Sequence, residues 1–255
     1  MTNMLFYIPF LYRYQTREKG KYFLPLIMTD FLPPLILCTN IFTSFSVTTL
    51  LIYLFAFWGM FDFYEIGYIL NDAVTVKNEK KPTLRLNNKQ MQHYNKYCML
   101  IFGLRLIYFM VSSIVLFFFE KNLTYFLLLN LILLISYCFH NYIRNKLRYF
   151  TNSLLNMAKY FIPVIFFNTN SNLTKFMVFF FLFPFFRSIT YGIEREIKKL
   201  NTDSFIFVFY LFALLVLIGL RKFTAINIDM PSILFIAIFC LYRLLCLIKR
   251  KKYLN

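Results

Sequence analysis

The sequence has few charged residues and few glycines, and both shortages exclude classes of protein. Only 15% of the 255 residues are charged, whereas a typical soluble domain carries about 25%. The six glycines form neither a phosphate-binding loop nor a nucleophile elbow. With two histidines and five cysteines that show no paired spacing, neither a His/Cys metal cluster nor a disulfide framework is indicated. No soluble-enzyme signature is present.

Apolar and aromatic residues fill the chain instead. Hydrophobic residues make up 60% of it and aromatic residues 22%, and the mean hydropathy is +0.60. A soluble protein of this size could not bury so much apolar surface. The apolar runs are continuous rather than alternating, which favours helices, because a helix satisfies its own backbone hydrogen bonds in lipid. We therefore predict an all-α polytopic transmembrane helical bundle.

Eight apolar runs are candidates for membrane spans, which need about 20 residues each. They are 23–45, 47–70, 98–119, 122–140, 154–168, 173–190, 205–220 and 230–248. The first contains Asp30 and Pro33-Pro34, so we expect its inner half to be irregular. The count is about eight, or nine if one span is hidden.

The predicted domain organisation is simple. A single transmembrane domain covers 23–248, preceded by a segment at 1–22 and followed by a basic tail at 249–255. The N-terminus lacks the pattern of a signal peptide. Met4 to Tyr14 is apolar and aromatic but too short to span, which is typical of an interfacial helix.

The basic residues are distributed asymmetrically between the predicted loops. The chain has 28 Lys and Arg against 11 Asp and Glu, giving a net charge of +17. With the N-terminus inside, 21 basic residues lie on the cytoplasmic side, four lie outside and three lie within spans. This is the positive-inside pattern, so we interpret the charge as a topology signal rather than as a nucleic-acid interface. It predicts a plasma or inner membrane protein with both termini and the polar loops in the cytoplasm.

Carboxylates gather at the end of the second predicted span. Glu65, Asp72 and Glu79 follow one another at seven-residue steps, so they share one helix face within about 40°. Asp62 flanks the same stripe. Carboxylates beside Asn71 offer the hard oxygen ligands that Mg²⁺ prefers. The alternative is that the last of them are solvated at a helix end.

Arg105 lies well inside the third predicted span. An unpaired charge there costs at least about 2.5–3.5 kcal/mol, so a partner is expected. Either Arg105 forms an ion pair with Asp62 or Glu65, or it contacts a phosphate of a substrate.

Two further polar groups face the same predicted side. Arg144 and Arg148 are spaced i, i+4 and can clamp one phosphate from one helix face; an ordinary basic loop touching anionic lipid is the alternative. Further along, Glu194 and Lys198 share the same spacing and either form a surface ion pair or belong to a site.

The run Glu65-Ile-Gly-Tyr-Ile-Leu-Asn71-Asp72 resembles the first motif of the UbiA superfamily of intramembrane prenyltransferases, Asn-Asp-x-x-Asp-x-x-x-Asp. This chain keeps Asn71 and Asp72, has Thr75 at the third position and Glu79 at the fourth, so one carboxylate is lost. Downstream, the run from Lys81 to Arg85 is similar to the basic run of the phosphoribosyl-transferring branch. The resemblance covers roughly residues 20 to 250.

The resemblance implies a bundle of usually nine spans around a central cavity, with an apolar tunnel for an isoprenoid tail and Mg²⁺ on the diphosphate. The implied catalytic residues are Asn71, Asp72 and Glu79, and the implied metal ligands are these three with Glu194 and Glu196. The implied substrate-binding residues are Glu65, Lys81, Arg85, Arg105, Tyr137, Arg144, Arg148, Tyr191 and Lys198.

The leading hypothesis is a Mg²⁺-dependent prenyltransferase-like enzyme that transfers the prenyl group of a polyprenyl (di)phosphate to an unknown acceptor. An alternative enzyme transfers a phosphoribosyl or sugar-phosphate group to polyprenyl phosphate. Outside the enzymes, a lipid or small-molecule transporter would also bury charges, although the sequence has no internal repeat. A degenerate, non-catalytic scaffold is the remaining alternative.

Overall fold

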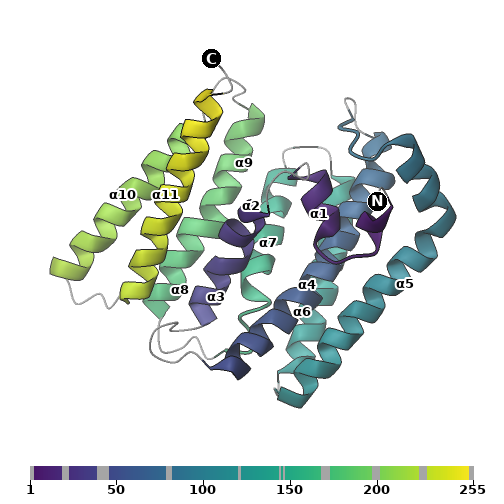
Figure 1. Cartoon of the computed structure of the whole chain (residues 1–255), viewed down its shortest axis with the longest axis horizontal. Helices are drawn as coiled ribbons and strands as arrows, with labels where there is room; N and C mark the ends of the chain where they lie inside the picture. Colours follow the sequence, from purple (N-terminus) through teal and green to yellow (C-terminus); the bar gives the residue numbers. More distant parts are fainter. Residues whose placement is uncertain are drawn as a thin grey trace. The chain divides into compact units, whose positions relative to one another are not determined.

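The computed structural model describes residues 3–18, 23–38, 46–78, 82–119, 122–143, 145, 147–167, 173–196, 202–223 and 229–252 (Figure 1). Its elements are η1 (Met4–Phe6), α1 (Leu11–Thr16), α2 (Leu24–Leu26), η2 (Ile27–Phe31), α3 (Leu32–Cys38), α4 (Val47–Ala73), η3 (Thr75–Asn78), α5 (Asn88–Phe119), α6 (Leu123–Tyr142), α7 (Leu147–Phe161), α8 (Leu173–Phe180), η5 (Phe181–Phe185), α9 (Phe186–Glu196), α10 (Thr202–Phe223) and α11 (Met230–Lys252). Within these ranges every element is helical, which confirms the all-α class.

Six helical stretches are long and apolar enough to cross a membrane. They are Val47–Ala73, Asn88–Phe119, Leu123–Tyr142, Thr174–Ile193, Asp203–Lys222 and Met230–Ile248. Each corresponds to one of the eight predicted spans. The other two predicted spans, 23–45 and 154–168, fall on shorter elements: an apolar helical stretch at Leu24–Cys38 and α7 with the turns that follow it.

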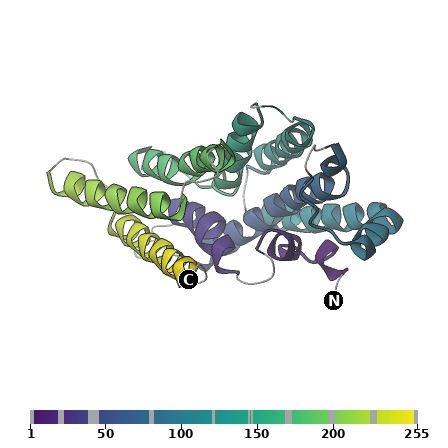
Figure 2. The same cartoon turned by 90° about the horizontal axis from the view of Figure 1, so that it is seen from above.

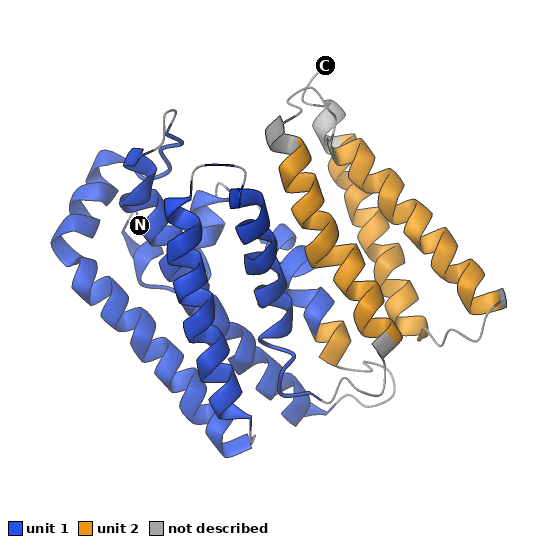
Figure 3. Ribbon diagram, turned by 180° about the vertical axis from the view of Figure 1, so that it is seen from behind, with its two compact units in different colours: residues 1–34, 46–167 blue, residues 35–45, 168–255 orange. Residues whose placement is uncertain are grey.

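The chain forms two compact units (Figure 3). Unit 1 comprises residues 1–34 and 46–167, and unit 2 comprises residues 35–45 and 168–255. The predicted single transmembrane domain thus contains two units, and all the buried charges described below for the candidate site belong to unit 1.

Helix α4 is the central element of unit 1 and packs against α5 and α6. It begins at a serine cap, where the Ser46 hydroxyl accepts a hydrogen bond from the Thr49 amide at 3.0 Å. Two glycines permit the close packing. A Cβ on Gly59 would lie 2.2 Å from the Ser112 hydroxyl oxygen, and one on Gly67 would lie 2.2 Å from the ring of Tyr137. Small residues of this kind let helices approach closely in membranes.

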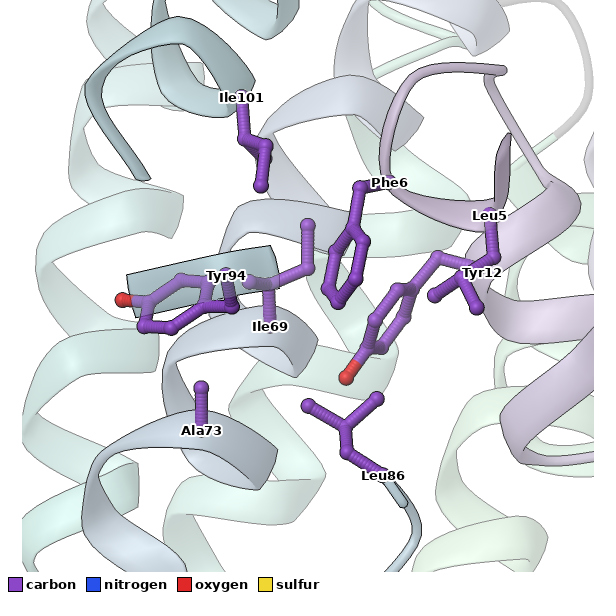
Figure 4. Packing of buried hydrophobic residues seen from close by; sticks show 8 residues of the cluster. All are labelled: Leu5, Phe6, Tyr12, Ile69, Ala73, Leu86, Tyr94 and Ile101. Atoms are coloured by element: carbon purple, nitrogen blue, oxygen red, sulfur yellow. The ribbon is translucent and has the colours of Figure 1, made fainter. Parts of the chain in front are cut away.

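The N-terminal segment, residues 3–18, packs on α4 and α5 (Figure 2). Its apolar side chains enter a core cluster in which Phe6 and Tyr12 lie beside one another with ring centroids 5.7 Å apart (Figure 4). The other members of the cluster are Leu5, Ile69, Ala73, Leu86, Tyr94 and Ile101. The segment that the sequence suggests is interfacial is therefore held by side chains of unit 1.

The predicted irregularity at the Pro33-Pro34 pair is present as the π-helical turn η2. Proline has no amide hydrogen, so Pro33 cannot donate to the carbonyl of Thr29 as a helix would require. The hydroxyl of Tyr160 on α7 donates to that carbonyl instead. A helix break in an apolar environment is thereby satisfied by a neighbouring side chain.

Helix α7 and the turns after it run back along α6. Near the end of α6, His140 Nδ1 lies 2.7 Å from the hydroxyl oxygen of Thr151 in the first half of α7. Near the start of α6, the ring of Phe126 lies 5.3 Å from that of Phe166. Residues 151–166 therefore return over most of the length of α6.

Unit 2 contains α8, η5, α9, α10 and α11, with α10 and α11 side by side. Its aromatic core includes Phe183, Tyr210 and Phe239, whose rings contact one another. Pro184 lies in the π-helical turn η5, where the Tyr210 hydroxyl donates to the carbonyl of Leu182 at 2.6 Å.

Candidate functional site

The C-terminal half of α4 carries the carboxylates of the candidate site. Asp62, Glu65 and Asp72 are all buried, as is Asn71. The helix ends one residue later, at Ala73, and the turn η3 follows. The sequence prediction that these side chains do not face solvent at a helix end is therefore correct for Asp72.

Asp72 binds two arginines. The Arg17 guanidinium forms a fork, with Nη1 donating to Oδ2 at 2.8 Å and Nη2 donating to Oδ1 at 3.1 Å. Arg85 Nη1 donates to Oδ1 at 3.1 Å. The Tyr12 hydroxyl donates to Oδ2 at 3.0 Å, and Asn71 Nδ2 donates to Oδ1, also at 3.0 Å. We call these five residues the Asp72 cluster.

The charges of the Asp72 cluster reinforce this pairing. Burial lowers the pKa of the Arg17 guanidinium, but the charge of Asp72 and the neighbouring Tyr68 outweigh it, so the pKa lies above its ordinary value. Burial, followed by the charge of Asp72, raises the pKa of Tyr12 well above its usual range. Arg17 therefore stays charged and Tyr12 stays a hydrogen-bond donor at any physiological pH.

Arg105 pairs with the other two carboxylates of α4. Its Nη1 lies 2.9 Å from Asp62 Oδ1 and 2.7 Å from Glu65 Oε2, and its side chain is fully buried. Its Nη2 also donates to the carbonyl of Ile8 at 3.2 Å. Arg105 therefore has the partner that its position required, and of the two alternatives the ion pair is present, with both candidate carboxylates at once. We call these three residues the Arg105 triad.

Glu65 also caps the N-terminal helix α1. Its Oε2 accepts from the Phe10 amide at 3.0 Å and its Oε1 accepts from the Arg13 amide at 2.9 Å. These two amides are among the four that a helix start leaves without partners. Phe10 itself has a left-handed backbone with φ 66°, a conformation that a bulky residue adopts at a cost.

A third buried charge group is the Asp30 triad. Asp30 on η2 pairs with Arg13 on α1 and with Lys159 on α7, whose Nζ lies 3.2 Å from Oδ1. Lys159 Nζ also lies over the ring of Tyr64, 4.7 Å from its centroid. Asp30 and Lys159 lie in the predicted spans 23–45 and 154–168, and their pairing was not predicted. The available signal was that each is a charge in an apolar run that needs an opposite charge.

Tyr137 belongs to an aromatic group between these charges. Its ring contacts those of Tyr64 and Tyr68 in edge-on arrangements, with centroids 4.8 Å and 5.7 Å away. On the other side of the group, the Arg17 guanidinium stacks on Tyr68 at 4.4 Å. Asn141, one turn beyond Tyr137, donates to the carbonyl of Gly67 at 2.9 Å.

An apolar pocket of about 440 Å³ lies on the other side of the N-terminal segment. Its walls are Phe10, Phe23, Leu26, Ile27, Phe31, Leu54, Phe57 and Trp58. Phe10 joins the pocket to the charged region, because its ring lines the pocket while its amide binds Glu65.

The structure brings together some of the predicted site residues and leaves others apart or outside its description. Asn71, Asp72 and Arg85 meet in one cluster, and Glu65 with Arg105 forms another. Arg148 lies on α7 in unit 1 and Tyr191 on α9 in unit 2. Glu79, Lys81, Arg144 and Lys198 lie outside the described residues, as do the side chains of Glu194 and Glu196.

Tyr12, Arg13 and Arg17 are the main residues that sequence reasoning missed. Tyr12 and Arg13 lie in the Met4 to Tyr14 stretch that was interpreted as an interfacial helix, and Arg17 lies just beyond it in the 1–22 segment. The partners of Tyr12 and Arg17 are 60 and 55 residues away along the chain. The spacing of Arg13 and Arg17, four residues apart on one helix face, was a signal that both point in one direction.

The described residues do not fit a magnesium site of the kind the resemblance implies. Within the described ranges, no three His, Cys, Asp or Glu residues are grouped so that they could hold a metal ion. Asp72 accepts from five donors, whereas a carboxylate offers about four lone-pair positions. A magnesium role stays a prediction that involves Glu79, Glu194 and Glu196.

The arrangement can hold an anionic group at the end of α4, because two guanidinium groups, that of Arg17 as a fork, converge there on a single carboxylate. Comparisons of this chain with models of protein families, with curated proteins and with solved structures found no match.

Proposed function

We propose that the protein is an integral membrane transferase that acts on a polyprenyl phosphate or diphosphate and transfers the prenyl group to an acceptor. The observation that carries the proposal is the Asp72 cluster. It places two arginines, Arg17 and Arg85, at the last turn of a buried apolar helix. This is where the phosphate end of a lipid would lie while its tail stays in the apolar region.

The chemistry requires that a leaving diphosphate be neutralised. Loss of a diphosphate from an allylic carbon leaves negative charge on its oxygens, and fixed cations in a water-poor site stabilise that charge most effectively. Arg17 and Arg85 supply such cations, and Tyr12 supplies a neutral donor beside them. The apolar pocket lined by Phe10 and Phe57 has a volume within the range of about 300–1,000 Å³ typical of ligand sites, and its aromatic walls suit an isoprenoid chain.

We propose eight membrane crossings, with the Asp72 cluster at the cytoplasmic end. Two observations support the count beyond the six long helices. Arg17 contacts Asp72 at the end of α4, while Ser46 caps its start, so the chain between them travels the length of a 27-residue helix. Residues 151–166 likewise travel back along α6. The topology matches the positive-inside pattern of the loops.

A sugar-phosphate transferase is the second candidate. Arg85 is the last residue of the Lys81 to Arg85 run that is similar to the phosphoribosyl-transferring branch, and it contacts Asp72 directly. In this candidate the polyprenyl phosphate is the acceptor, and the cluster binds the phosphates of the sugar donor.

The deciding experiment is an assay on membranes that contain the protein, with radiolabelled polyprenyl diphosphate in one arm and labelled phosphoribosyl diphosphate in the other, each with Mg²⁺ and with EDTA. We expect labelled lipid product from one arm, and loss of that product in Arg85→Gln with the protein still folded. Product from the second arm alone would favour the sugar-phosphate candidate. Folded protein without turnover of either donor would overturn the transferase proposal.

A further inference from the structure

The Asp72 cluster has more positive than negative charge. Two guanidinium groups face one carboxylate, and Tyr12 and Asn71 add neutral donors. Asp72 is completely buried as a side chain, whereas those of Arg17 and Arg85 are 17% and 25% exposed. A ligand can therefore reach the cations while the carboxylate stays covered.

Arg17 binds Asp72 with the same bidentate geometry with which arginine binds a phosphate. Both of its Nη atoms donate, one to each carboxylate oxygen, and this paired geometry suits carboxylate and phosphate equally. Arg17 has a second anchor, because its guanidinium stacks on Tyr68 at 4.4 Å. It would stay in place if its hydrogen bonds moved from Asp72 to another anion.

We infer that Asp72 is a built-in competitor for a phosphate or diphosphate group, and that binding of that group transfers Arg17 and Arg85 from the carboxylate to the ligand. The inference rests on the proposed function only for the class of ligand. It assigns a new role to Asp72, which opposes binding rather than promoting it, and it makes Arg17 a residue that exchanges one anion for another.

A competitor role and a metal-ligand role for Asp72 predict opposite effects on phosphate binding when its charge is removed. A carboxylate that holds Mg²⁺ on a diphosphate strengthens binding, so its neutralisation weakens binding when Mg²⁺ is present. A carboxylate that occupies the arginines weakens binding, so its neutralisation strengthens it without any metal. The Asp72→Asn variant separates the two, because it keeps the shape of the side chain and removes only the charge.

The experiment measures binding of inorganic pyrophosphate to the purified full-length protein in detergent, by titration calorimetry in EDTA. We expect Asp72→Asn to bind about tenfold more tightly, which is the equivalent of about one charge-assisted hydrogen bond. Arg17→Gln and Arg85→Gln should each bind at least about tenfold more weakly on the same basis. Lys89→Gln is the matched control, because Lys89 is an exposed cation near Arg85 and its loss should change nothing.

Unchanged or weaker binding by a folded Asp72→Asn protein would overturn the inference. So would an equal loss of affinity in Lys89→Gln, which would mean that the net charge alone attracts pyrophosphate.

If Asp72→Asn fails to fold, the double variant Asp72→Asn/Arg85→Gln replaces it and is compared with Arg85→Gln. The double variant must then bind pyrophosphate about tenfold more tightly than Arg85→Gln. If pyrophosphate binding changes as expected but no donor is turned over, the proposed function alone is refuted. If a donor is turned over but pyrophosphate binding does not depend on Arg17 and Arg85, this inference alone is refuted.

Discussion

Arg105 balances two carboxylates with one guanidinium nitrogen, since its Nη1 contacts both Asp62 and Glu65. All three side chains are fully buried, so none can exchange its partner for water. Two anions sharing one cation leave an excess of negative charge at this point. The backbone amides of Phe10 and Arg13 add donors to Glu65 and offset part of that excess.

We therefore expect Arg105→Gln to lower the free energy of unfolding by about 3–5 kcal/mol, the usual cost of leaving a buried charge without its partner. The double variant Arg105→Gln/Asp62→Asn should recover part of the loss, because one of the two orphaned charges is gone. Thermal unfolding in detergent measures both. A single variant as stable as the parent protein would show that water reaches this triad.

Gly67 and Gly103 form a natural pair of test and control. Both lie inside helices, but a Cβ on Gly67 would meet the ring of Tyr137 at 2.2 Å, whereas one on Gly103 would meet nothing within 4 Å. We expect Gly67→Ala to lower the free energy of unfolding by about 1–3 kcal/mol through overpacking, and Gly103→Ala to leave it unchanged or higher. Equal melting temperatures for the two variants would contradict the close approach of α4 and α6.

Residue-level prediction from sequence succeeded where a charge lay in one predicted span and its partners lay in the span before it. The need of Arg105 for a partner follows from its position in an apolar run, and its partners lie on the preceding predicted span. The Asp30–Lys159 pair was not predicted because 129 residues separate the two. Nothing in a single sequence indicates which of several distant segments becomes the neighbour of a charge.

At the scale of elements, hydropathy located the apolar part of each long helix well and the polar part poorly. The third span was predicted from residue 98, and α5 begins ten residues earlier, at Asn88. The backbone of Tyr97 departs from helical geometry, with φ −122° and ψ 17°. The predicted boundary thus coincides with a kink between a polar and an apolar helical stretch, and hydropathy recognises only the apolar one.

The docking of α1 depends on an acceptor that lies on another helix. Glu65 on α4 binds the amides of Phe10 and Arg13 at the start of α1, in place of the local side chain that commonly caps a helix. We expect Glu65→Gln, which keeps an acceptor but loses the charge, to speed hydrogen exchange at these two amides while leaving α6 unaffected. Exchange measured by mass spectrometry on peptides from residues 5–14 and 126–137 provides the comparison. Equal protection of residues 5–14 in both proteins would mean that the apolar cluster alone holds the segment.

At the scale of the whole molecule, the positive-inside pattern and the packing of unit 1 favour the same topology. The N-terminal segment and the stretch before α5 both contact Asp72, so they lie at one end of α4. Helix α5 ends at Phe119, and Asn122 directly precedes α6 at that other end of α5. The division into two units was not predicted, because no glycine-, serine- or proline-rich linker marks a boundary in the sequence.

Labelling of single cysteines with a membrane-impermeant maleimide tests this topology. In a variant whose native cysteines are replaced (Cys38, Cys98, Cys138, Cys240 and Cys246), Asn122→Cys should react in intact cells. Met4→Cys and Leu84→Cys, at exposed positions, should react only after the membrane is opened. If one of Met4→Cys and Leu84→Cys reacts in intact cells and the other does not, the chain between them crosses an odd number of times, which would reject eight crossings.

The dependence of the N-terminal segment on distant partners also imposes an order of assembly. Translation produces residues 3–18 before their partners Glu65, Asp72, His93 and Arg105. The last of these leaves the ribosome roughly 90 residues after the segment itself, going by the 97-residue separation between Ile8 and Arg105. Residues 3–18 are therefore synthesised before the helices that fix them, and they can take their final position only after α4 and the first part of α5 have been made.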